Sequence, residues 1–269
     1  MQTSAPLTNT ERRDNVLFLL AAYEAADRRP PEILTDDERR LYCAGDARVQ
    51  RRLFFRLLCY GALAAQPAPE AVVLADWRRL VAAGVIDDVY DRAFDVYRFA
   101  AAPPVARTDS KGRVIDFLRL SESRDLWWRL LPQPADDAEV IDTLYSCSGG
   151  ALKSRAFWVT REMLRHELWP ANGLRRAACV PDGRVRKRAS RIGLVDLPEN
   201  AETIDDMKAV SASLHAVLGL AGHEARDRFD FPLATASQRC EICDRQRMAA
   251  CAMPHCRYRR VLLAGSVAA

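Results

Sequence analysis

Four cysteines near the C-terminus constrain this chain more than any other feature of its sequence. Half of its eight cysteines fall within residues 240–256, separated by two, seven and four residues, at Cys240, Cys243, Cys251 and Cys256. Four thiolates this close together suit one metal ion or one iron–sulfur cluster. The first residues lack the basic and apolar segments of a secretory signal, so we expect a reducing, cytoplasmic setting. There, clustered cysteines bind metal rather than form disulfides.

Helical periodicity runs through most of the sequence, and strand-like alternation is hard to find. Helices are predicted at 10–26, 47–65, 69–83, 87–101, 116–131, 136–145, 151–168, 183–193 and 201–219. Residues 105–115 are expected to form a loop or a short hairpin. No apolar run approaches the length of about 18 residues that a membrane-spanning helix needs. The sequence therefore predicts an all-α protein that does not cross a membrane.

Basic residues are concentrated in two places, although the net charge is only +4. A run with a single acid, Asp182, lies between Arg175 and Arg191, and more arginines surround the C-terminal cysteines. This distribution favours nucleic acid as a partner. The alternative is a solvated helix face without a ligand.

Three segments ahead of the cysteines carry candidate functional residues. An apolar helix ends at Ala64-Ala65-Gln66, and the small residues Ser148-Gly149-Gly150-Ala151 join two helices, with Lys153 just inside the second. Asp182 then precedes a basic helix that carries Arg184 and Arg188. Backbone amides in a small-residue turn can bind a phosphate, and a carboxylate can stabilise positive charge on a sugar. The ordinary alternatives are a plain helical corner, a solvated lysine and a helix N-cap.

In this order, the segments resemble the helix-hairpin-helix DNA glycosylases, especially their iron–sulfur branch, over roughly residues 50 to 260. That family has an apolar helix ending in small residues and Gln, as at Ala64-Ala65-Gln66. Its hairpin is roughly Leu-Pro-Gly-x-Gly-x-Lys, which Cys147 to Lys153 match here except that Ala151 replaces the second Gly. Its catalytic Asp lies in a Val-Asp-x-x-Val-type turn, matched by Pro181-Asp182-Gly183-Arg184-Val185.

The resemblance implies an enzyme that flips a damaged or modified base out of DNA and cleaves its N-glycosidic bond. Asp182 would be the essential carboxylate, and Lys153 the candidate nucleophile, which would add AP-lyase activity. Gln66 would fill the space of the flipped nucleotide. The DNA contacts would come from Gly149, Gly150, Ala151, Arg184 and Arg188. Oxidised, alkylated and hypermodified bases all remain candidate substrates.

The resemblance also implies a structural [4Fe–4S] cluster on Cys240, Cys243, Cys251 and Cys256. Because the cysteine spacing differs from that usual in the family, zinc remains the alternative. We expect two helical lobes with a DNA-binding cleft between them. Residues 50–160 would form one lobe, which ends in the helix-hairpin-helix. Residues 1–49 together with 161–269 would form the other lobe.

The expected protein is a monomer on double-stranded DNA, in the cytoplasm and associated with the nucleoid. Two other functions stay open. One is a non-catalytic nucleic-acid-binding or damage-sensing protein of the same fold. The other is a glycosidase acting on modified nucleosides.

Overall fold

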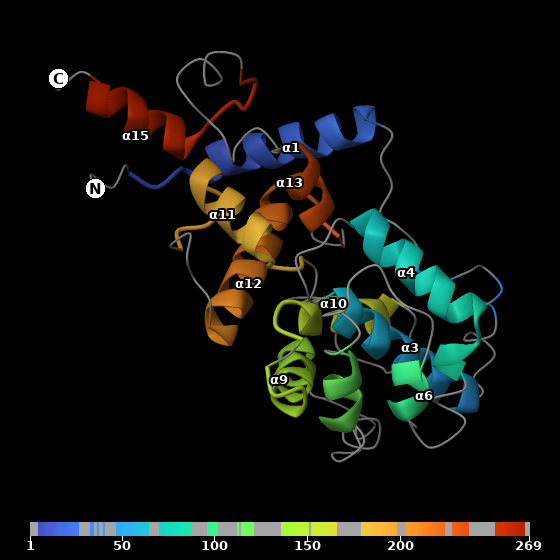
Figure 1. Cartoon of the computed structure of the whole chain (residues 1–269). Coiled ribbons are helices and arrows are strands. Elements are labelled where there is room, and N and C mark those ends of the chain that lie inside the picture. The colour runs from blue at the N-terminus through green and yellow to red at the C-terminus, as the bar shows by residue number, and fades with distance from the viewer. Residues whose placement is uncertain are drawn as a thin grey trace. The chain divides into compact units, whose positions relative to one another are not determined.

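The described part of the chain, in a computed structural model, is helical throughout (Figure 1). It comprises residues 5–26, 33–34, 37, 40, 47–64, 70–87, 96–101, 112, 114–120, 136–150, 152–165, 179–197, 203–223, 228–236 and 251–266. No strand occurs within these ranges, so the predicted all-α class is confirmed. Among the described helices, none is long and apolar enough to cross a bilayer.

The chain divides into two compact units. We call Met1–Pro30 with Arg175–Ala269 the terminal unit, and Pro31–Leu174 the middle unit. The terminal unit contains α1 (Asn9–Ala25), α11 (Gly183–Ile192), α12 (Ile204–Leu220), α13 (Asp230–Ala236) and α15 (Arg257–Ser266). The middle unit contains α3 (Ala47–Ala64), α4 (Glu70–Ala82), α6 (Val96–Ala101), α9 (Asp137–Cys147) and α10 (Arg155–Arg165).

In the terminal unit, α1 packs against α12 and α13, and α11 packs against α12, α13 and α15 (Figure 1). The apolar faces of α1, α11, α12 and α13 form one buried core, in which Leu19, Ile192 and Leu214 are fully excluded from solvent. Cys251 and Cys256 pack against this core. The cysteine segment is therefore attached to the hydrophobic centre of the unit.

In the middle unit, α3 packs closely against α10. A Cβ atom placed on Gly61 would lie 2.8 Å from Cγ2 of Val159, so only glycine fits this contact without a shift. Tyr60 touches the rings of Trp77 in α4 and Trp158 in α10, with centroid distances of 5.5 and 5.0 Å. One tyrosine thus joins three helices.

Several predicted helix boundaries are correct, whereas the start of one helix and part of one predicted loop are wrong. Helix α11 begins after Asp182 and ends at Gly193, whose φ of 83° lies in the left-handed region. The helix predicted from Ala151 begins instead at Arg155, because Lys153 has a φ of 44°, which an α-helix cannot continue. Within the predicted loop 105–115, the described residues 112, 114 and 115 are helical.

Gly61→Ala tests the close contact of α3 with α10. Alanine is normally better than glycine inside a helix by about 1 kcal/mol. Here its Cβ would meet Val159, so we expect a lower melting temperature in the wild-type background. In a Val159→Ala background the same change should be tolerated, giving a clear coupling energy in a double-mutant cycle. Additive effects of the two substitutions would contradict the contact.

Candidate functional site

The turn between α9 and α10 is built by two left-handed glycines. Gly149 and Gly150 have φ values of 58° and 78°. Their amides donate to the carbonyls of Ser146 and Tyr145, at 3.1 and 2.9 Å, which ends α9. Since each amide has one hydrogen, these two predicted phosphate donors are already engaged. The third, Ala151, lies outside the described residues.

Lys153 and Ser154 follow these glycines and lie directly before α10. Lys153 is exposed, and among the described residues its ammonium group has no acidic partner. Within the same ranges, the backbone amides of Lys153 and Ser154 have no hydrogen-bond acceptor. The N-terminal end of a helix favours an anion. The candidate phosphate-binding amides are therefore those of Lys153 and Ser154 rather than those of the glycines.

The C-terminal end of α3 meets this turn. Arg155 Nε donates to the carbonyl of Ala64 at 2.9 Å, which satisfies one of the carbonyls left open at the end of α3. The predicted wedge, Gln66, comes two residues after Ala64 and lies outside the described residues. The link places the helix that leads to Gln66 beside the turn that carries Lys153.

Asp182 is the N-cap of α11. Its Oδ1 accepts hydrogen bonds from the amides of Arg184 and Val185, both at 2.8 Å. In the described part of the chain, Oδ2 has no hydrogen-bond donor, and the side chain is partly exposed. The capping role weighed from the sequence is thus present, and it occupies one carboxylate oxygen. Asp182 belongs to the terminal unit, whereas Lys153 belongs to the middle unit.

The two arginines predicted to contact DNA have different surroundings. Arg184 is exposed at the start of α11. Arg188 is 3% exposed, and its guanidinium donates to the carbonyls of Leu233, at 3.5 Å, and Ala234 near the end of α13. These surroundings do not support the predicted DNA contact of Arg188. Its charge stabilises the carbonyl end of a helix inside the unit.

Two of the four predicted metal ligands, Cys251 and Cys256, are described, and Cys240 and Cys243 lie outside the described residues. Burial raises the pKa of the Cys256 thiol above its ordinary value, and the charge of nearby Cys251 acts in the same direction. Within the described ranges, no group of three or more side chains is suited to a metal. Cys251 and Cys256 could supply half of the predicted ligand set.

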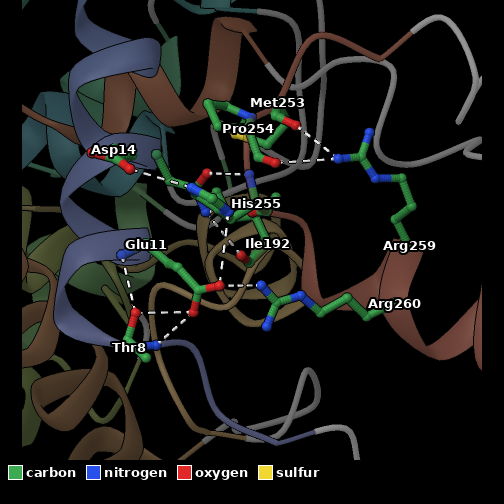
Figure 2. Close-up of polar contacts among 10 residues, drawn as sticks. Thr8, Glu11, Asp14, Ile192, Met253, Pro254, His255, Arg259 and Arg260 are labelled. Atoms are coloured by element: carbon green, nitrogen blue, oxygen red, sulfur yellow. Dashed lines mark hydrogen bonds and ion pairs between the residues drawn. The ribbon is translucent and has the colours of Figure 1, made fainter.

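Arg259 binds the turn that carries these cysteines. Its Nη1 donates to the carbonyl of Cys251 at 3.4 Å. Its Nη2 donates to the carbonyls of Met253 and Pro254, both at 3.2 Å, as Figure 2 shows. The sequence suggested that arginines around the cysteines face DNA phosphates. For Arg259 the structure shows a different use, because its guanidinium binds backbone carbonyls of the cysteine segment itself.

Asn15 binds the same segment from the side of α1. It is fully buried, and its Nδ2 donates to the carbonyls of Ile192, at 3.3 Å, and His255. Its Oδ1 accepts from the amide of His255 at 3.0 Å. These hydrogen bonds connect α1 with the end of α11 and with the residue before Cys256. Sequence reasoning missed Asn15, because a polar residue within an apolar helix face carries no local sign of its partners.

Glu11 joins the start of α1 to α15 (Figure 2). Its Oε2 accepts from the Thr8 amide at 2.8 Å, and its Oε1 pairs with Arg260. The Thr8 hydrogen bond, together with Arg260, lowers the pKa of Glu11 from 4.5 to about 2. The pattern Thr8-x-x-Glu11 is that of a capping box and is readable from the sequence.

No protein-family model, curated protein or solved structure matches the chain. The function therefore has to be argued from the residues themselves. They form three groups: the α9–α10 turn with Lys153, the cap of α11 with Asp182, and the cysteine turn held by Asn15 and Arg259.

Glu11→Gln tests the acid-sensitive link between α1 and α15. Because the pKa of Glu11 is lower in the folded protein, its ionised carboxylate stabilises the fold above pH 4.5. This contribution is lost as the pH falls toward about 2. We expect the variant to be less stable than wild type at neutral pH and equal to it near pH 2, as measured by urea denaturation at each pH. Glu24→Gln, at the other end of α1, is the control. A stability difference that persists at the acid end would contradict the assignment.

Proposed function

We propose that this chain is a DNA glycosylase that flips a damaged or modified base and cleaves its N-glycosidic bond. The observation that carries the proposal is the α9–α10 turn. It presents an exposed Lys153 and two amides without acceptors among the described residues, next to the end of α3. A cation and free amides together suit a phosphate or a reacting deoxyribose.

Asp182 supports the proposal from the terminal unit. Its Oδ1 is fixed by two backbone amides, which sets the direction of the carboxylate while Oδ2 stays available in the described part of the chain. A fixed carboxylate can stabilise the positive charge that develops on the sugar as the bond to the base breaks. It needs no rearrangement to do so, since α11 already holds it.

Lys153 is the proposed nucleophile. Its unprotonated amine would bond to the sugar C1′ while the C1′–N bond breaks and the base leaves with a proton. Opening of the sugar ring at the C1′–O4′ bond would then give a Schiff base between Lys153 and C1′. Cleavage of the DNA strand could follow. Lys153 and Asp182 are carried by different units.

The proposed DNA contacts are Arg184, the turn before α10 and Gln66, on double-stranded DNA bound by a monomer. The proposed metal centre uses Cys240, Cys243, Cys251 and Cys256, with a [4Fe–4S] cluster as the first choice and zinc as the alternative. The chemistry of four thiolates suits either. The metal centre would have a structural role, since the cysteine turn contacts the core and α11.

Asp182→Asn separates catalysis from capping. Asparagine caps a helix about as well as aspartate, so the melting temperature should stay unchanged, while base release from damaged duplexes should fall by roughly 100-fold or more. Asp136→Asn is a matched control, because Asp136 caps α9 with hydrogen bonds of 2.9 and 3.0 Å. This control should keep full activity.

The same assay tests the competing functions. If wild type binds damaged duplexes without releasing any base, and Asp182→Asn binds equally well, the chain is a non-catalytic binder. Release of base from free nucleosides that is as fast as from DNA would indicate a nucleosidase. Either result would rule out the proposed DNA glycosylase.

Lys153→Ala tests the covalent step. Borohydride reduction during turnover should trap wild-type protein on DNA through a Schiff base, and the variant should give no adduct because it lacks the amine. Lys187→Ala, which removes the same charge from α11, should still be trapped. An adduct of undiminished yield with Lys153→Ala would exclude Lys153 as the nucleophile.

A further inference from the structure

We infer that Asn15 and Arg259 are positioning residues, which hold the turn from Cys251 to Cys256 in a metal-binding conformation before any metal arrives. The inference rests on the metal centre of the proposed function. It assigns a role to two side chains that lie outside the set of four cysteines.

Asn15 fixes the backbone just before Cys256. Its amide is fully buried and makes three hydrogen bonds, two of them to the amide and carbonyl of His255. A buried amide must keep its partners, because it has no water to replace them. The His255 peptide groups are therefore held in one orientation, and Cys256 follows directly.

Arg259 fixes the other part of the turn. Its guanidinium donates to the carbonyl of Cys251, the first of the two described cysteines. It also donates to the carbonyls of Met253 and Pro254, which Figure 2 shows. The guanidinium group is planar, and its donors keep a fixed geometry. Lysine would preserve the charge and could not reproduce this three-carbonyl arrangement.

The same contacts join the turn to α11. Asn15 also donates to the carbonyl of Ile192, and Cys256 Sγ lies 4.0 Å from the carbonyl of Arg191. Hydrogen bonds from protein groups thus fix the backbone beside both cysteines. Residues that orient metal ligands in this way strengthen metal binding.

The first measurement is thiol labelling of the full-length, metal-free protein, with mass spectrometry to follow Cys251 and Cys256 separately. In wild type both should react slowly. Asn15→Leu, which keeps the size and removes the hydrogen bonds, and Arg259→Lys should each speed their labelling several-fold, while Cys59, buried in the middle unit, stays protected.

Two matched controls separate positioning from general stability. Ser211→Ala removes a buried hydrogen bond of 2.7 Å to the carbonyl of Cys179 in the same unit. Arg257→Lys changes an arginine that pairs with Asp196 at 3.4 Å and binds none of the turn carbonyls that Arg259 binds. Both controls should leave the labelling of Cys251 and Cys256 unchanged.

The second measurement is metal binding, after iron, sulfide and zinc analysis of the purified protein. With Zn²⁺ as the probe, the affinity of the protein for Zn²⁺ should fall by roughly 10–100-fold in Asn15→Leu and Arg259→Lys. It should stay unchanged in both controls. Labelling rates equal to wild type in both folded variants would overturn the inference. If wild type binds neither iron nor zinc, and labelling still depends on Asn15, the metal centre is overturned while Asn15 still holds the turn.

Discussion

The buried amide of Asn15 is the interaction on which the terminal unit depends. It joins three segments, namely α1, the end of α11 at Ile192 and the cysteine turn at His255. Asn15 and His255 are 240 positions apart, so this contact closes nearly the whole chain into one loop. Closing such a loop costs chain entropy, and the buried core of α1, α11, α12 and α13 offsets that cost. The hydrophobic effect is not directional. The hydrogen bonds of the Asn15 amide therefore fix how these segments are oriented within the core.

Many of the arginines serve carbonyl groups within the fold. Arg155 binds the end of α3, Arg188 binds the end of α13, and Arg259 binds the cysteine turn. The chain has far more arginines than lysines, and carbonyls at helix ends lack intrahelical partners. A basic stretch of this sequence therefore does not by itself identify residues that would contact DNA. Of the two arginines assigned to DNA, only Arg184 keeps an exposed position.

Features set by local sequence were predictable. The all-α class follows from periodicity, and the limits of α11 follow from Asp182 as cap and Gly193 as left-handed terminator. The predicted start of α10 was wrong because a lysine in the sequence does not indicate a left-handed backbone, which Lys153 adopts. The partners of Arg188 and Asn15 depend on tertiary contacts between distant segments, which periodicity does not encode. Gln66, Ala151, Cys240 and Cys243 lie outside the described residues, so their roles stay predictions.

The backbone at Lys153 bears on the site proposed at the α9–α10 turn. Among the described residues, only Lys153 and Arg228 adopt a positive φ without being glycine, and this costs about 1 kcal/mol or more for an L-residue. Arg228 is 9% exposed and leads into α13, so packing can offset its strain. Lys153, in contrast, is exposed. Backbone strain of this kind clusters at ligand sites, which agrees with the role proposed for this turn. Glycine at this position would relieve the strain, and the amine would be lost with it.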